Sequence, residues 1–188
     1  MESPMFCRHV HLPLQSGSTR VLKLMNRGYT ADHYALLVRR IREALTEVSL
    51  TTDILTGFPG ETEADFAETL GAMETIGFDD AFMYYYNPRE GTPAFSMPDA
   101  LPDAVKLERL SRVIETQRSI GRRRALERIG KEVEVLVEGV SKKEKGELLA
   151  RTQWDAMVVF PGELSRIGQF ARVRLAALAG ATFKAEAV

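Results

Sequence analysis

Three loops, each placed directly after an apolar run, constrain the fold of this 188-residue chain more than any other feature. They cover residues 11–18, 57–62 and 86–94 and are rich in Gly, Pro and small polar residues. A pattern of strand, loop and helix that repeats is typical of a parallel α/β sheet or barrel. Because the carboxyl ends of parallel strands meet at one edge, we expect the three loops to form the rim of a single site.

Three strands are predicted in this first part of the chain. They lie at residues 10–14, 48–55 and 78–86, where β-branched, aromatic and other apolar residues are concentrated. The last run is continuously apolar and aromatic, which is typical of a parallel strand that is covered on both faces.

Helices are predicted between and after these strands. Thr30 is a candidate N-cap for the first helix, and Thr62 and Asp65 form a pattern like a capping box at the start of the next. A long helix is expected at residues 101–128. The side that it would bury contains Leu107, Leu110, Val113 or Ile114, Gln117 and Ile120. Alternation of these helices with the strands favours a parallel α/β sheet or barrel.

A second domain is predicted after residue 129, where the composition changes. Residues 130–188 contain five short runs of alternating apolar residues, separated by turns that contain glycine or proline. Short strands at this spacing are typical of a small all-β barrel. We therefore predict an α/β domain over residues 1–129 and a β-barrel over residues 130–188.

Composition limits the kind of protein this can be. The formal net charge is −1, so attraction to nucleic acid would have to come from a local cationic patch. One cysteine, Cys7, excludes an internal disulfide and favours the reducing cytoplasm. The sequence has no apolar run of the about 20 residues that a membrane helix needs, so no membrane association is expected.

The second loop has the residue types of a ligand site. Gly57 and Gly60 would let the backbone approach a ligand closely, Phe58 could stack on a planar ring, and Glu61 could accept hydrogen bonds from a hydroxyl or ammonium group. The alternative is a tight turn before a capped helix. Acidic residues in the first helical turn, Glu61 and Glu63, favour a zwitterionic or ribose-bearing ligand over a free phosphate.

Other polar residues near the loops are also candidates. Asp53 lies inside an apolar strand, so it either faces the site or pairs with a buried cation. Arg89 suits a carboxylate or phosphate, or is a solvated loop residue. Tyrosines 84–86 could offer one ring for stacking or could belong to the core. His9 and His11 are candidate ligands or bases, but two histidines without a third ligand favour structural roles over a metal site.

The order and residue identities of these segments resemble those of the radical S-adenosylmethionine (SAM) methylthiotransferases. The resemblance rests on Thr-Asp-Ile at residues 52–54, Gly-Phe-Pro-Gly-Glu-Thr at 57–62 and Tyr-Asn-Pro-Arg-Glu-Gly-Thr-Pro-Ala at 86–94. It implies the later half of the family's partial (β/α) barrel. The residues that it would place near SAM and the sulfur-donating cluster are Gln15, Ser16, Asp53, Gly57, Phe58, Gly60, Glu61 and Arg89.

The family's cluster cysteines are not in this sequence. The resemblance implies SAM and two [4Fe–4S] clusters as cofactors of the full enzyme, held by cysteines that lie upstream of the resembling part. Cys7 matches none of them. We therefore expect no cluster in this chain, no metal site and no catalysis by the isolated chain. The missing N-terminal part of the enzyme would be its partner, and the chain would be a fragment, a truncated form or half of a split protein.

Residues 136–162 resemble the TRAM module, a small RNA-binding barrel. The residues here are most similar to those of the tRNA branch of the family, which modifies N6-isopentenyladenosine at position 37. This resemblance implies the tRNA anticodon arm as partner and no role for DNA. Asp155 stands where the family usually has Asn, and a carboxylate there weakens an RNA contact. The residues expected to contact RNA are Ser141, Lys142, Lys143, Lys145, Arg151 and Thr152.

Two alternatives to the tRNA methylthiotransferase stay open at this point. A methylthiotransferase of the ribosomal-protein branch would recognise a protein loop, and a non-catalytic RNA-binding module would use the α/β part only as scaffold. The single tryptophan, Trp154, could stack on a base or belong to the barrel core.

Overall fold

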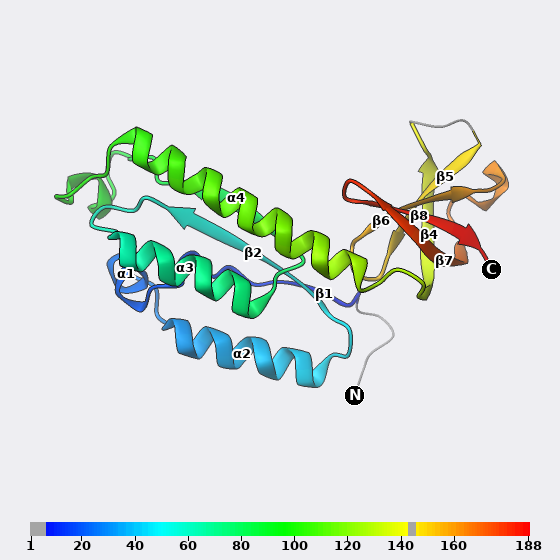
Figure 1. The fold of residues 1–188 in the computed structure, drawn as a ribbon, viewed down its shortest axis with the longest axis horizontal. Coiled ribbons are helices and arrows are strands. Elements are labelled where there is room, and N and C mark those ends of the chain that lie inside the picture. The colour runs from blue at the N-terminus through cyan, green and yellow to red at the C-terminus, as the bar shows by residue number, and fades with distance from the viewer. Residues whose placement is uncertain (1–6, 143–145) are drawn as a thin grey trace. The chain divides into compact units, whose positions relative to one another are not determined.

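The computed structural model describes residues 7–142 and 146–188, and these residues form two compact units (Figure 1). We call them the α/β unit and the barrel unit. The division falls between Gly121 and Arg122. A domain boundary after residue 129 stays a prediction. The α/β unit comprises Val10–Thr46 and Leu50–Gly121, and the barrel unit comprises the described residues among 7–9, 47–49 and 122–188.

A three-stranded sheet confirms the predicted parallel α/β architecture (Figure 1). Its strands are β1 (His9–His11), β2 (Ser49–Thr56) and β3 (Asp80–Tyr85), in the order β1-β2-β3. Strands β2 and β3 run parallel, and a parallel bridge joins Gln15 to Ile54 beyond the end of β1. The loops that follow the three strands therefore begin at the same edge of the sheet.

The helices begin largely where the sequence predicts. The side chain of Thr30 accepts a hydrogen bond from the amide of His33, and Thr62 and Asp65 form a complete capping box. Helix α1, which Ser18 caps, was not predicted because its six residues are too few for a periodic pattern. The helical segments are α1 (Thr19–Leu24), α2 (Ala31–Ala44), α3 (Glu63–Ile76), η1 (Pro93–Ser96) and α4 (Asp103–Leu126). Among the described residues, no helix combines the length and the apolarity that crossing a bilayer demands.

The prediction that the third strand is covered on both faces is wrong. In β3 the side chains of Phe82 and Tyr84 are 58% and 55% exposed, whereas Ala81, which points to the opposite face of the sheet, is buried. Strand β2 shows the same asymmetry, because its residues alternate between buried and partly exposed. The sheet therefore has one covered face and one open face in the described part of the chain, and the open face carries the aromatic side chains.

The predicted face of α4 is buried at Val113, Gln117 and Ile120 but differs at the N-terminal end of the helix. There Leu107 is exposed, whereas Lys106 and Arg109 are buried. Apolar periodicity assigns charged residues to solvent, and it fails at this end because both charged groups find partners inside the α/β unit. These partners are described with the site below.

A closed five-stranded barrel confirms the prediction for the C-terminal part. Its strands are β4 (Glu132–Val140), β5 (Glu147–Thr152), β6 (Met157–Pro161), β7 (Phe170–Ala179) and β8 (Thr182–Ala187), with the short helix η2 (Leu164–Arg166) between β6 and β7. The strands follow the order β4-β5-β6-β8-β7, and β4 pairs with β7 to close the ring. Every pair is antiparallel except β6 with β8, which is parallel.

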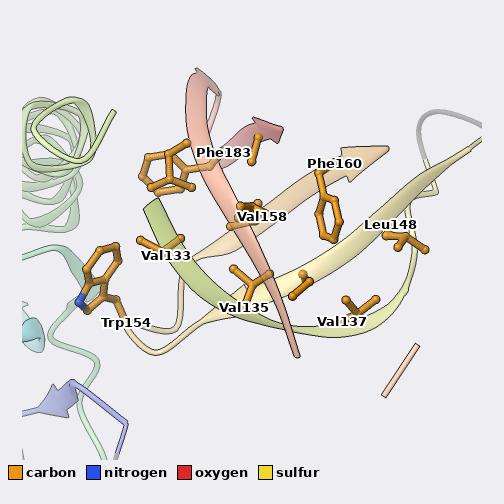
Figure 2. Close-up of a cluster of buried hydrophobic side chains, with 13 residues drawn as sticks. Val133, Val135, Val137, Leu148, Trp154, Val158, Phe160 and Phe183 are labelled. Atoms are coloured by element: carbon orange, nitrogen blue, oxygen red, sulfur yellow. The ribbon is translucent and has the colours of Figure 1, made fainter. Parts of the chain in front are cut away.

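The barrel core is apolar and well filled (Figure 2). Alternate residues of β4, namely Val133, Val135 and Val137, point inward, and Phe160 is fully buried among them. Trp154 is 3% exposed and belongs to this core cluster, with the guanidinium of Arg128 4.6 Å from its ring centroid. Of the two roles open for Trp154, the structure therefore supports the core role.

The first loop packs so closely on α3 that only glycine fits at position 17. A Cβ atom on Gly17 would lie 2.5 Å from the carbonyl oxygen of Glu68 and 2.6 Å from the Cα of Thr69. We expect Gly17→Ala to lower the free energy of unfolding by about 1–3 kcal/mol, because backbone must move to admit the methyl group. Urea unfolding followed by far-UV circular dichroism measures this. The control is Gly28→Ala, where no atom lies within 4 Å and little change is expected; equal losses in both variants would contradict the argument.

Candidate functional site

The first loop extends the sheet and then turns into the protein. Gln15 has a φ of 69°, and its N–H donates to the carbonyl of Asp53 at 2.8 Å while its own carbonyl accepts from Leu55 at 2.8 Å. Ser16 is completely buried, with its Oγ 3.2 Å from the Oγ1 of Thr69. The structure thus keeps Gln15 beside the end of β2, while the hydroxyl of Ser16 is engaged with α3.

The second loop is a tight turn with both glycines in the left-handed region. The φ angles of Gly57 and Gly60 are 72° and 76°, which favours glycine over any other residue. The N–H of Gly57 donates to Oε2 of Glu61 at 2.7 Å and closes the turn. The ring of Phe58 is 6% exposed and meets Tyr86 edge to face, with centroids 5.2 Å apart. Phe58 therefore joins the second loop to the third.

The carboxylate of Glu61 lies in a buried ion pair. Its side chain is 1% exposed, and Oε2 also accepts from Nη1 of Arg109 at 2.7 Å. Burial raises the pKa of Glu61, while the Gly57 amide and the Arg109 guanidinium oppose that shift. The other oxygen, Oε1, is buried with no hydrogen-bond partner among the described residues. Glu61 thus has its charge balanced inside the protein.

Two cations of α4 complete this arrangement, and sequence reasoning missed both. Arg109 Nη1 also donates to the backbone carbonyl of Glu61 at 3.1 Å. Lys106 is 5% exposed, with Nζ 2.8 Å from Oδ1 of Asp103 and 3.4 Å from the carbonyl oxygen of Tyr86. A signal was present: these cations stand three residues apart, on one side of a helix and four and seven residues before the buried Val113.

The third loop borders an open pocket of about 500 Å³ at the carboxyl ends of β2 and β3. Arg89 is exposed, and its guanidinium has no hydrogen bond or ion pair with the residues that the structure describes. The carbonyl of Arg89 accepts from Oγ1 of Thr92 at 2.7 Å, which orders the loop. The pocket is lined by Leu55, Tyr84, Tyr85, Tyr86, Asn87, Arg89, Thr92 and Ala94.

Asp53 lies on the open face of the sheet, two residues before the pocket residue Leu55 in β2. Its side chain is 27% exposed, and Oδ1 lies 3.6 Å from Nε2 of His11. The other ring nitrogen of His11 is 3.0 Å from Oγ1 of Thr51, and its ring meets Phe82 edge to face. The sequence left two roles open for Asp53, facing the site or pairing with a buried cation. The structure supports the first, because Asp53 is on the open face and its neighbour is the half-exposed His11.

The described residues contain no group of three or more His, Cys, Asp and Glu side chains that could hold a metal ion. Nδ1 of His9 lies 3.5 Å from Oδ2 of Asp155. Cys7 is exposed and forms no disulfide.

The predicted RNA-binding residues differ in how accessible they are. Thr152 is buried, and its Oγ1 accepts from the amides of Trp154 and Ala156, both at 3.2 Å. Arg151 donates to Oε1 of Glu138 at 2.8 Å and to Oδ1 of Asp155 at 2.7 Å. These two carboxylates raise the pKa of Arg151 and compete with phosphate for it. RNA contact by these residues stays a prediction.

The turn between β4 and β5 leaves its described residues accessible. Lys142 is exposed, and the backbone of Ser141 donates to the carbonyl of Glu147 at 2.8 Å. Lys143 and Lys145, which the sequence also predicts to contact RNA, lie outside the described residues. The amino group of Lys142 is therefore the predicted RNA contact that is accessible in the described part of this turn.

Comparison with known families assigns both parts of the chain. Residues 2–73 match the radical SAM superfamily, and residues 127–188 match the TRAM domain. The three-stranded parallel sheet lies largely in the first match, and the closed five-stranded barrel lies in the second.

Two similar curated proteins carry the same name. A tRNA-2-methylthio-N(6)-dimethylallyladenosine synthase of Moorella thermoacetica is 51% identical over 90% of this chain and 38% of its own length. The synthase of the same name from Treponema denticola is 49% identical over 95% of this chain and 40% of its own length. The chain thus spans about two fifths of the length of these relatives. It carries a partial radical SAM domain followed by a TRAM domain, and it is similar to tRNA-2-methylthio-N(6)-dimethylallyladenosine synthases over nearly its whole length.

Proposed function

We propose that this chain is part of a radical SAM enzyme that attaches a methylthio group to C2 of N6-isopentenyladenosine at position 37 of tRNA. The observation that carries the proposal is the aromatic pocket at the carboxyl ends of β2 and β3, in a chain with this similarity. Beside it lies Arg89, whose guanidinium pairs with none of the described residues. The names of the relatives favour tRNA over a ribosomal protein as substrate. They also favour an enzyme over a non-catalytic RNA-binding module.

The pocket suits SAM in size and chemistry. A volume of about 500 Å³ is within the usual range for small-molecule sites. The rings of Tyr84 and Tyr86 offer apolar surface to the adenine and exclude water from it, and Arg89 offers a planar fork to the carboxylate. In this proposal Gln15 of the first loop and Asp53 of β2 approach the ligand from beside the pocket. When bound, SAM supplies the activated methyl group and, with a reduced iron–sulfur cluster, the radical.

The other predicted SAM residues would act through the shape of the loops. The hydroxyl of Ser16, the ring of Phe58 and the carboxylate of Glu61 all have partners inside the protein. Gly57 and Gly60 hold the turn in the left-handed region. In this proposal these five residues fix the rim, while the residues that border the open side contact the ligand.

The residues present do not fit a [4Fe–4S] cluster. Such clusters take three or four thiolate ligands, and these 188 residues contain one cysteine. We therefore derive no step through a cluster from this chain. In the proposal, the cluster ligands come from the remaining part of the enzyme, consistent with the two fifths of the relatives that this chain spans. Activity would require that part as partner.

Binding to an anticodon stem-loop tests the tRNA proposal. We expect the whole chain to bind a stem-loop with isopentenyl at A37 more tightly than the unmodified one, and both more weakly as salt rises. Lys142→Ala is expected to weaken binding severalfold and to reduce the slope of log K against log salt by about one, because one phosphate contact is lost. Fluorescence anisotropy at two salt concentrations measures both quantities.

The matched control for charge is Lys23→Ala, which removes an exposed lysine of α1. Binding by this variant should equal that of the unchanged chain. Failure of the chain to bind either stem-loop at low salt would contradict RNA recognition by this part of the enzyme, and equal losses for both lysine variants would contradict the assignment to the β4–β5 turn.

A further inference from the structure

We infer that Arg109 and Lys106 of α4 are positioning residues that hold the loop at residues 57–61 in the shape needed for ligand binding. The identity of the ligand rests on the proposed function, whereas the hold on the loop rests only on contacts within the α/β unit. Neither cation lines the pocket. Their effect on binding therefore passes through the loop.

Arg109 connects the two ends of the loop through one carboxylate. Oε2 of Glu61, the last loop residue, accepts from the N–H of Gly57, the first, and from Nη1 of Arg109, both at 2.7 Å. The same Nη1 donates to the backbone carbonyl of Glu61 at 3.1 Å. A carboxylate this deeply buried is costly unless it is paired, so Arg109 is what allows Glu61 to stay ionised and close the turn.

Lys106 packs its side-chain stem against the same loop. Its side-chain stem lies where a Cβ of residue 57 would be, since that atom would stand 2.4 Å from Cγ of Lys106. Gly57 is thus needed for two reasons, its φ of 72° and this close approach. Nζ of Lys106 reaches the carbonyl of Tyr86 at 3.4 Å, and Tyr86 lines the pocket. One helix therefore contacts both the second loop and the end of β3.

The neighbouring Arg112 provides a matched control. Both guanidinium groups lie over the ring of Phe66, at 5.2 Å for Arg109 and 4.7 Å for Arg112. Arg112 pairs with Glu63 and Glu108, outside the loop at residues 57–61. Loss of Arg112 therefore removes a helix cation and a ring contact but leaves the loop contacts in place.

A buried ion pair is weak evidence for stability, because well-packed apolar residues often stabilise a protein as much. Its value here lies in geometry. The planar guanidinium fork of Arg109 directs Nη1 to Oε2 and to the backbone carbonyl of Glu61, while Nη2 donates to Oε2 of Glu63 at 3.2 Å. These bonds fix the position of the oxygen that accepts from the Gly57 amide. A lysine at position 109 offers a point charge without this fork, so Arg109→Lys is expected to restore charge but not loop geometry.

Amide exchange in the whole 188-residue chain, without ligand, tests the inference. We expect Arg109→Met to raise the exchange rate of the Gly57 amide at least about tenfold, because its acceptor loses a fixed position. Arg112→Met should leave that rate unchanged. Amides in the middle of β2, such as Ile54, should keep their protection in both variants. Arg109→Lys should resemble Arg109→Met rather than the unchanged chain.

A second variant and a SAM titration complete the test. Lys106→Ala removes the stem beneath Gly57 and should also raise exchange there, which carries the test if Arg109→Met does not fold. Isothermal titration should give at least about tenfold weaker SAM binding for Arg109→Met than for Arg112→Met. Equal Gly57 protection in the unchanged chain, Arg109→Met and Lys106→Ala would overturn the inference. Faster exchange in a chain that binds no SAM would leave the hold on the loop intact and contradict the SAM site instead.

Discussion

Replacing Asp65 by alanine is expected to lower the free energy of unfolding by about 3–5 kcal/mol, among the largest effects of any single change in the α/β unit. Asp65 is the third residue of α3, and its side chain is 7% exposed. It accepts from Oγ of Ser18 at 2.6 Å, from Nε of Arg20 at 3.1 Å and from the amide of Thr62 at 2.8 Å. The variant would leave these donors of the first loop and of the helix N-terminus without their common acceptor.

Urea unfolding followed by the helical circular dichroism signal measures this loss. Asp32→Ala is the matched control, because Asp32 is also an acidic residue in the first turn of a helix but is exposed and outside any capping box. Its removal should cost no more than about 1 kcal/mol, the usual value for a first-turn charge. Similar losses for both variants would contradict the special role of Asp65.

The same carboxylate predicts how stability depends on pH. Burial by itself would raise the pKa of Asp65, but hydrogen bonds from Arg20, Ser18 and Thr62 outweigh it and hold the pKa well below its usual range. In the unfolded chain the pKa of an Asp carboxyl is about 3.9. Because the pKa in the folded state is lower, the carboxylate contributes its full stabilisation above about pH 4, and this stabilisation is lost as the pH falls toward the folded-state pKa. The unchanged chain should therefore lose more stability than the Asp65→Ala variant between about pH 4 and pH 2.

Phe160→Ala is expected to destabilise the barrel by about 3–5 kcal/mol, the usual cost of emptying a buried phenylalanine site. Phe160 is fully buried in the barrel core and lies opposite Leu148 across the β5–β6 pair (Figure 2). Packing around it is close, because a Cβ on Gly162 would lie 2.6 Å from a methyl carbon of Leu148 and 3.6 Å from the Phe160 ring. The space is therefore expected to collapse only partly in the variant.

Fluorescence of Trp154 reports this transition, because it is the only tryptophan and belongs to the same core. The control is Phe170→Ala, which removes an identical side chain that is 68% exposed. A change within about 0.5 kcal/mol is expected for that surface position. If the two variants shifted the midpoint equally, the assignment of the barrel core would be wrong.

Local sequence patterns predicted the elements whose determinants are local. Thr62 and Asp65 are three residues apart, so the capping box is visible in the sequence. Alternating valines likewise marked the inward face of β4. Each of these signals depends on neighbours within one helical turn or one strand, which is why the structure confirms them.

Signals that depend on distant partners could not be interpreted in the same way. Arg109 looks like a surface residue until Glu61, 48 positions earlier, is known to lie against it. The aromatic run of β3 looks like a doubly covered strand, but whether a second layer covers Phe82 is a property of the whole assembly of elements. For the candidate site, residue types marked the loops correctly as a cluster, whereas the direction of Ser16 and Glu61 depended on α3 and α4.

The strand order of the barrel has a consequence for biosynthesis. Strand β8 lies between β6 and β7, so the ring β4-β5-β6-β8-β7 cannot close until residues 182–187 have emerged from the ribosome. The sheet of the α/β unit, by contrast, has all three strands once residue 85 is available. During translation the nascent barrel would therefore wait with unpaired edges on β6 and β7, a period in which a chaperone could shield them from aggregation.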